Sequence, residues 1–116
     1  MKESIVQQKS FQFSLKIILL YKKLQKDKEF IISNQTLRSG TSIGANIEEA
    51  LAGQSKRDFT AKMSNSSKEA RETKYWLRLL KESELTNLDV NSLILDIDEF
   101  ILNFNLDCEN ISTKPN

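Results

Sequence analysis

The chain has 116 residues with a formal net charge of +1, and 28% of the residues are charged while 39% are hydrophobic. This length suits a single domain, whose core buries about two thirds of the unfolded surface without disulfides or metal. The sequence contains no histidine, which excludes hydrolase triads, the common catalytic zinc sites and di-metal sites built on Glu-x-x-His. We therefore expect a protein that is not an enzyme and that needs no cofactor.

The single cysteine, Cys108, excludes an intrachain disulfide and a thiolate zinc cluster, and it favours a reducing compartment. Residues 1–10 lack the apolar core of a signal peptide, and the longest strongly apolar run, Ile17–Tyr21, is too short to cross a bilayer. These features predict a cytoplasmic location, no membrane partner and no small-molecule substrate. With three glycines and one proline, Pro115, the chain has few helix breakers, so we expect an all-α fold.

The first predicted helix has its cap at Ser4 or Ser10 and ends near Glu29. Lysines lie on its outer side, and Lys28 falls in the closing turn, where a cation suits the negative end of the helix. Apolar residues at helical spacing form its inward seam, and a second apolar row widens that seam. The seam and the second row are, respectively, Phe13, Ile17, Leu20 and Leu24, and Phe11, Leu15, Ile18 and Tyr21.

The boundaries of the second and third helices are predicted from connector and cap residues. Phe30–Ile32 is expected to be an apolar connector that tucks into the core, and Ser33 or Asn34 is expected to cap the second helix. Gly53 is expected to close that helix with a positive φ. The segment Ser55–Asp58 resembles a capping box for the third helix.

Two glycines fall on the apolar seam of the second helix, within Leu37–Leu51. Each glycine costs a helix interior about 0.8–1 kcal/mol relative to alanine, so we expect a close neighbour that offsets this cost. The alternative is that residues 38–44 form a loop between two shorter helices. The expected neighbour is the third helix, and replacing either glycine with leucine is expected to damage folding or assembly. The seam residues are Leu37, Gly40, Gly44, Ile47 and Leu51.

The third predicted helix is the longest and has a thin middle. Its seam alternates spacings of four and three, as in a coiled coil. Small residues occupy the centre of the seam, which permits close approach of another helix. The seam residues are Phe59, Met63, Ser66, Ala70, Thr73, Leu77 and Leu80.

The fourth predicted helix has its cap at Thr86 or Asn87, and residues 107–116 are expected to form a frayed tail. Short connections between four helices predict an up-down-up-down four-helix bundle with a single domain over residues 1–116. The inward face of the fourth helix is Val90, Leu93, Ile94, Ile97, Phe100, Ile101 and Phe104.

The predicted helices contain two patterns that could indicate a ligand site. Glu48, Glu49, Glu69 and Glu72 lie on neighbouring predicted helices and suggest an all-carboxylate metal site, but pairing with Arg38, Arg71 or solvent is the favoured interpretation. Residues 40–44 lack the lysine and the hydroxyl residue of a P-loop and the third glycine of a dinucleotide site. We therefore expect no metal site and no phosphate loop.

The charge is distributed unevenly along the chain. Residues 1–84 contain 16 Lys or Arg and 10 Asp or Glu, whereas residues 85–116 contain one and six. A polar stripe on the third helix becomes purely basic in its second half, so it needs an anionic partner. One candidate partner is the acidic face of the fourth helix, Asp96 and Glu99, and the other is nucleic-acid phosphate. The stripe is Arg57, Thr60, Ser64, Ser67, Arg71, Lys74, Arg78 and Lys81.

Four segments together resemble the four-helix-bundle family associated with intervening sequences in bacterial 23S ribosomal RNA genes: Arg38–Ala50, Ser55–Phe59, Lys68–Thr73 and Tyr75–Leu77. That family is similar in fold to the accessory protein of diversity-generating retroelements, a barrel-like pentamer that binds a reverse transcriptase and nucleic acid. The resemblance implies a homo-oligomer, a pentamer, that has no enzymatic activity and has an RNA or ribonucleoprotein partner.

We therefore expect a homo-oligomeric adaptor that associates with nucleic acid or a ribonucleoprotein. The alternative is a pure protein-interaction module, such as a reverse-transcriptase accessory, that does not bind RNA directly. The candidate residues for helix packing or oligomer contacts are Gly40, Gly44, Asn46, Ala70 and Trp76. The candidate phosphate contacts are Lys16, Lys22, Lys23, Arg57, Arg71, Lys74, Arg78 and Lys81.

Overall fold

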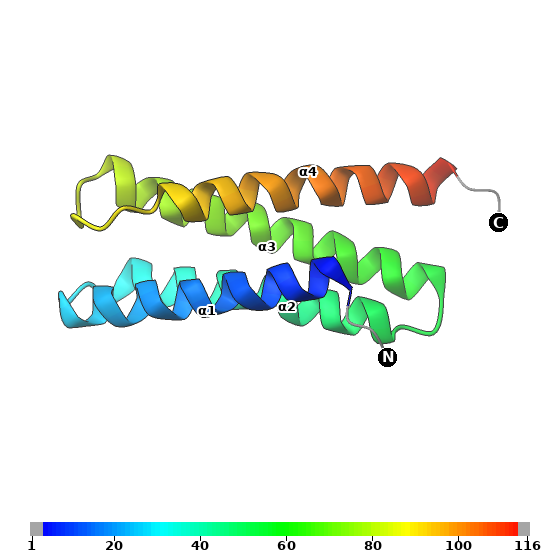
Figure 1. Ribbon diagram of the computed structural model, residues 1–116, viewed down its shortest axis with the longest axis horizontal. Helices are drawn as coiled ribbons and strands as arrows, with labels where there is room; N and C mark the ends of the chain where they lie inside the picture. The colour runs from blue at the N-terminus through cyan, green and yellow to red at the C-terminus, as the bar shows by residue number, and fades with distance from the viewer. Residues whose placement is uncertain (1–3, 114–116) are drawn as a thin grey trace.

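The computed structural model describes the backbone of residues 4–113 and the side chains of residues 4–105. Four helices run along one elongated bundle, and no strand occurs among the described residues (Figure 1). The α1–α2 and α3–α4 connections lie at one end of the bundle, and the α2–α3 connection lies at the other. The predicted all-α, up-down-up-down four-helix bundle is therefore confirmed. The helices are α1 (Ile5–Lys26), α2 (Ile31–Ala52), α3 (Lys56–Glu82) and α4 (Asn91–Thr113).

Helix α1 begins with the capping box that its sequence permits at Ser4. Ser4 Oγ accepts a hydrogen bond from the backbone N–H of Gln7, and Gln7 Oε1 accepts one from the backbone N–H of Ser4. Two otherwise unpaired N–H groups are thereby satisfied. The helix ends at Lys26, three residues before the predicted end, because Lys28 adopts a left-handed conformation with φ 64° and reverses the chain.

Helix α2 begins earlier than the sequence predicts. Its first residue is Ile31, and the Glu29 carboxylate accepts hydrogen bonds from the backbone N–H groups of Ile32, at 2.9 Å, and Ser33, at 2.7 Å. The Glu29 carboxylate thus caps the helix in place of the predicted Ser33 or Asn34, because it accepts hydrogen bonds from the free N–H groups of the first turn. Phe30 and Ile31 are 49% and 77% exposed, so the prediction of a connector tucked into the core is wrong for both.

Helix α2 passes through Gly40 and Gly44 without a break, as predicted, but the neighbour of the glycines is α1. A Cβ built on Gly40 would lie 2.9 Å from Ile17 Cγ1, and one on Gly44 would lie 3.5 Å from the Ser10 backbone oxygen. The prediction that the third helix approaches these glycines is therefore wrong. The glycines set the spacing between α1 and α2.

Helix α3 packs on the positions of α2 that come one residue before each glycine. Thr73 Oγ1 lies 2.8 Å from Ser39 Oγ, and Ser66 Oγ donates a 2.8 Å hydrogen bond to the backbone oxygen of Ile43. One residue corresponds to about 100° around a helix, so the glycines face α1 and the residues before them, Ser39 and Ile43, face α3. The small side chains at the centre of α3 permit this close packing. Ala70, which lies between Ser66 and Thr73, is fully buried.

Gly53 caps α2 but does not use the conformation predicted for it. Its φ is −65°, in the extended region that any residue adopts, so the prediction of a positive φ is wrong. Space is the reason for glycine here, because a Cβ would lie 3.1 Å from the Ala50 backbone oxygen and 3.3 Å from Asp58 Cβ. Ser55 caps α3 as predicted, accepting a hydrogen bond from the Asp58 N–H.

Helix α4 starts at Asn91, later than the predicted caps, and Asp89 accepts a hydrogen bond from its first N–H. The backbone is helical to Thr113, so the helix extends into the predicted tail over residues 107–116, whose side chains lie outside the described residues. Its inward face is buried as predicted, and Phe100 meets Phe13 of α1 edge to face, with ring centroids 5.7 Å apart.

Candidate nucleic-acid interface

A continuous positive surface lies on the outer side of α3. We call it the α3 basic face and define it as Lys68, Arg71, Lys74, Arg78 and Lys81. These residues recur at spacings of three and four, so they line one side of the helix over about four turns. Lys74 is half-buried and the others are exposed. Lys68 is absent from the sequence-based candidates, although its position three residues before Arg71 continues the same row.

Three cations of this face have polar partners within the chain. Lys74 Nζ lies 2.6 Å from Asp98 Oδ1 on α4, and Arg78 Nε lies 3.2 Å from Glu82 Oε2 one turn onward. Arg71 donates a 3.3 Å hydrogen bond to Asn105, which is neutral. Exposed ion pairs contribute only about 0–1 kcal/mol. Replacing Asp98 or Glu82 with another anion as the partner of these cations therefore costs little free energy.

The acidic residues of α4 pair differently from the prediction. Asp96 and Glu99 were the expected partners of the third helix, but they pair with Lys16, at 3.0 Å, and Lys9, at 2.5 Å, both on α1. Among the acidic residues of α4 whose side chains are described, Asp98 is the one that pairs with α3. Because Asp96 and Asp98 are two residues apart, they point about 200° apart around the helix, so α4 presents one acidic edge to each neighbour.

A groove of about 700 Å³ separates α1 from α4 beneath those two ion pairs. Its walls include Val6, Phe13 and Phe100. Lys16 lies on its rim and is directed at Asp96, so the structure assigns this candidate residue to a salt bridge between α1 and α4.

The structure groups only four of the eight candidate phosphate contacts on one surface. Helices α1 and α3 do not pack against each other in the described part of the chain, so the α1 lysines, Lys22 and Lys23 included, belong to a different surface. Arg57 is exposed, but it lies 14 positions before Arg71, about 21 Å along the helix. The grouped candidates are Arg71, Lys74, Arg78 and Lys81.

The glutamates considered for metal binding are engaged with cationic or amide groups. Arg38 bonds with its two terminal nitrogens to Glu69 and Glu72, which confirms the predicted pairing for these two. Glu49 lies 2.8 Å from Lys62, and Glu48 accepts hydrogen bonds from Gln7. In residues whose side chains are described, no three metal-ligating groups come together.

The ion pair between Lys62 and Glu49 makes the stability of the fold depend on pH. The hydrogen bond to Glu49, and then its charge, raise the pKa of Lys62 above the ordinary lysine value. A raised lysine pKa stabilises the fold below that ordinary value, and the benefit is lost as the pH rises through the folded-state pKa. The Lys62 ammonium between α2 and α3 is therefore charged at neutral pH, and its pairing with Glu49 is lost as it deprotonates in strongly alkaline solution.

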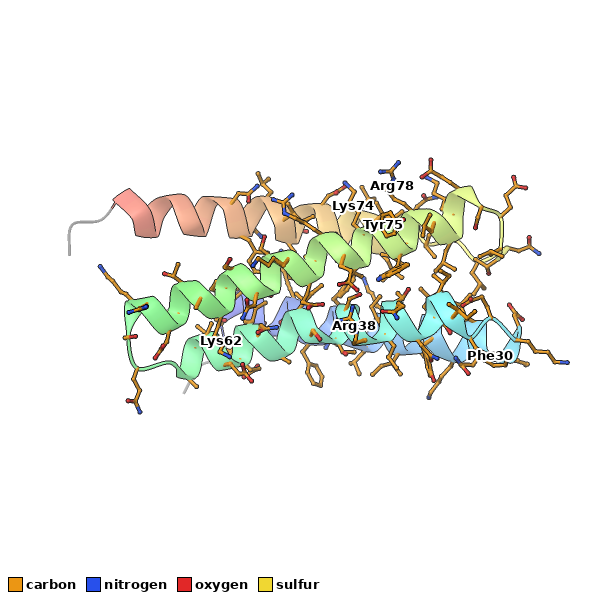
Figure 2. The ribbon with its side chains drawn as sticks, turned by 180° about the vertical axis from the view of Figure 1, so that it is seen from behind. Phe30, Arg38, Lys62, Lys74, Tyr75 and Arg78 are labelled. Atoms are coloured by element: carbon orange, nitrogen blue, oxygen red, sulfur yellow. The ribbon has the colours of Figure 1, made fainter. Side chains whose placement is uncertain are left out.

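An aromatic residue stands within the α3 basic face. Tyr75 is 58% exposed and lies four residues after Arg71 and three before Arg78. Figure 2 shows Lys74, Tyr75 and Arg78 gathered where α3 runs beside α4. Tyr75 is absent from the sequence-based candidates, although its position in the row of cations can be read from the sequence.

The residues predicted to mediate helix packing or oligomer contacts are buried or form hydrogen bonds within the chain. Gly40, Gly44 and Ala70 are buried. The Asn46 side chain donates to the Ser42 backbone oxygen, and Trp76 Nε1 donates to Glu72 at 2.9 Å. These positions therefore serve packing and local order within one subunit.

A different surface has exposed apolar residues. Phe11, Leu15 and Leu19 follow one another every four residues on α1 and are 59%, 42% and 57% exposed; we call them the α1 apolar stripe. The prediction that Phe11 and Leu15 widen the buried seam is wrong, because the neighbouring helices leave both side chains exposed, whereas Ile18 and Tyr21 of the same row are partly buried. Helix α4 exposes a second pair, Leu95 and Leu102.

The fold and its surfaces define the class of protein, which is a small all-α bundle. Most of its charged groups lie on the outside, either in ion pairs or on the α3 basic face. The chain belongs to the 23S rRNA-intervening sequence protein family, whose family model matches residues 2–104. The resemblance drawn from the sequence is thereby confirmed.

A solved structure supports the same assignment. The chain is similar to a protein of unknown function from the S23 ribosomal protein family of Bacteroides thetaiotaomicron VPI-5482, known from a crystal structure at 1.70 Å resolution. The two are 44% identical, the match covers 94% of this chain and 99% of the other, and the TM-score is 0.86. No curated protein matches the chain. Among the described residues, none of the helices combines the length and apolarity needed to span a bilayer.

Proposed function

We propose that this protein is a non-catalytic, homo-oligomeric adaptor that binds RNA through the phosphates, using the α3 basic face. The observation that carries the proposal is the row of cations on one outer side of α3, from Lys68 to Lys81. The name of the family connects its members with 23S rRNA intervening sequences, so RNA is the first nucleic acid to test. Cations at helical spacing neutralise phosphates without reading sequence.

The ion pairs on this face are compatible with such a role. The Arg78–Glu82 pair is exposed on both sides, and the Lys74–Asp98 pair joins two partly exposed groups. Since such pairs contribute little and are screened by salt, a phosphate can replace the carboxylate. Lys68, Arg71 and Lys81 add positive charge on the same face.

A binding titration tests the proposal. Purified protein is mixed with a labelled 23S rRNA intervening-sequence transcript, and anisotropy is followed between about 50 and 200 mM salt. Wild type is expected to lose affinity steeply with salt. The Lys74→Glu/Arg78→Glu variant is expected to bind more weakly at every salt concentration, with the slope reduced by about one for each lost phosphate contact.

The matched control is Lys22→Glu/Lys23→Glu, which makes the same change in charge on α1. It is expected to lose much less affinity, because α1 does not pack beside α3. An equal loss in both variants would remove the α3 basic face as the specific site. No binding at low salt, or binding that persists unchanged through the titration, would contradict phosphate recognition itself.

The second candidate function is a protein-interaction module that does not bind RNA, for example an accessory to a reverse transcriptase. The α1 apolar stripe favours it, because three exposed apolar residues in a row are typical of a protein contact. In this alternative the α3 basic face pairs with acidic residues of the same or a neighbouring chain. Dissociation of the oligomer by Lys74→Glu/Arg78→Glu, with no RNA bound by wild type, would favour this second function.

A further inference from the structure

Tyr75 has the surroundings of a stacking platform. Its ring meets that of Trp76 at 69°, with centroids 5.2 Å apart, while the residue remains 58% exposed. Arg71 and Arg78 lie about 6 Å before it and about 4.5 Å after it along the helix axis. The ring thus has an apolar support, a solvent-exposed surface and a cation on each side.

A hydrogen-bonded chain holds the support in place. Trp76 Nε1 donates to Glu72 Oε2 at 2.9 Å, and the same carboxylate oxygen bonds with Arg38 of α2. Arg38 also reaches Glu69, with 3.3 Å between Nη1 and Oε2. Because these contacts tie the indole to two helices, they restrict the orientation of the aromatic pair. Figure 2 shows Arg38 on α2 and Tyr75 on α3. An aromatic group already ordered in this way loses little entropy on binding.

We propose that Tyr75 stacks on an unpaired base and that Arg71 and Arg78 hold the flanking phosphates, so that the protein prefers single-stranded RNA to duplex. This inference rests on the proposed RNA-binding function and names the class of RNA. An aromatic ring between two cations is complementary to an unpaired nucleotide, because the ring can stack on the exposed base while the cations bind the phosphates on either side of it. In a duplex the bases are stacked on each other, so a duplex offers this surface only phosphates.

The test compares a short oligoadenylate with a duplex of equal length, using wild type, Tyr75→Leu and Tyr75→Phe. Wild type is expected to bind the single strand more tightly than the duplex. Tyr75→Leu is expected to weaken single-strand binding at least about fivefold, because the stacked base is lost. Tyr75→Phe keeps the ring and is expected to bind as wild type, and duplex binding is expected to be equal in all three proteins.

A second measurement reports the site directly. Trp76 is the single tryptophan of the chain, and its ring contacts Tyr75, so oligoadenylate binding is expected to change its fluorescence in wild type and less in Tyr75→Leu. Far-UV circular dichroism and a melting curve are expected to show that the exposed substitution leaves the fold intact.

The outcomes separate the two proposals. If wild type binds neither RNA at low salt, the RNA-binding function fails and this inference fails with it. If wild type binds RNA, but Tyr75→Leu binds the single strand equally well or the duplex is preferred, the inference alone is overturned and phosphate binding stands. A fluorescence change of the same size in Tyr75→Leu would also overturn it.

Discussion

At the scale of single residues, Gly40 and Gly44 look alike in the sequence but differ in the space around them. A Cβ on Gly44 would be 3.5 Å from its nearest neighbours, Ser10 and Ser14, which is an ordinary contact. A Cβ on Gly40 would be 2.9–3.2 Å from three carbons of Ile17, which is fully buried. The methyl group fits at one position and crowds the core at the other.

Alanine at the two positions is therefore expected to have opposite effects. Gly44→Ala is expected to stabilise the protein by about 0.5–1 kcal/mol, since it removes the entropic cost of glycine in a helix. Gly40→Ala gains the same stabilisation from the lost entropic cost of glycine, but it overpacks the core at a cost of about 1–3 kcal/mol, for a net loss of up to about 2.5 kcal/mol. Urea unfolding of both variants beside wild type measures the difference, and equal shifts of the midpoint would contradict this account.

The glycines also show what the sequence could and could not predict about single residues. Leu51, the last residue of the predicted seam, is 44% exposed, whereas Gly40, Gly44 and Ile47 are buried. The spacing was still enough to place the seam on a continuous helix. It did not say which neighbour the seam contacts, because a helix in a bundle has two neighbours and the positions facing them differ by about 100°. Likewise, Gly53 was correctly placed at a helix end, but its need for glycine comes from nearby atoms that only the fold brings close.

At the scale of an element, helix α2 depends on a carboxylate for its start. Side-chain rules favour Ser33 or Asn34 as caps, yet Glu29, two residues before the first helical residue, accepts from two backbone N–H groups. A negative charge at this end is also favoured by the helix dipole. The sequence could not indicate this arrangement, because it depends on the reversal at Lys28 that turns Glu29 toward α2.

Glu29→Ala is expected to destabilise the protein by about 0.5–2 kcal/mol, the usual cost of a lost helix cap. Glu29→Gln keeps an acceptor oxygen but loses the charge, so a smaller loss is expected. Lys26→Ala, an exposed change in the last turn of α1, is the control and is expected to be nearly neutral. Chemical unfolding ranks the three variants, and a Glu29→Ala protein as stable as the control would show that α2 does not need this cap.

At the scale of the whole molecule, the four-helix architecture and its buried core were predictable because the helical periodicity is strong in every segment. The candidate interface was only partly predictable. The row of cations on α3 follows from spacing, but the separation of the α1 lysines from it depends on how the helices are arranged. The pairing of Asp96 and Glu99 with α1 depends on the same arrangement.

The exposed apolar residues bear on assembly at this same scale. A closed ring of identical subunits needs two different complementary patches on each copy, whereas a two-fold dimer needs only one patch that matches itself. The described surface offers two patches, the α1 apolar stripe and the pair Leu95 and Leu102 on α4. A ring in which α1 of one copy meets α4 of the next would use both patches, and we propose this arrangement for the pentamer that the family resemblance implies.

The ring arrangement makes a prediction that a mixing experiment checks. Leu15→Glu and Leu95→Glu each place a charge on one patch and are each expected to give a monomer of 13.4 kDa by light scattering, whereas wild type is expected to give five times that mass. Ile31→Glu changes an apolar residue outside both patches that is 77% exposed, more than Leu15 or Leu95, and it is expected to leave the oligomer intact.

Each of the two monomeric variants still has the patch that the other has lost. An equimolar mixture is therefore expected to form a dimer through the one intact pair of patches and to stop there, since the outer faces of that dimer are the altered ones. A mixture that stays monomeric would show that the α1 stripe and the α4 pair do not contact each other. A wild-type protein that is monomeric at micromolar concentration would remove the oligomer altogether.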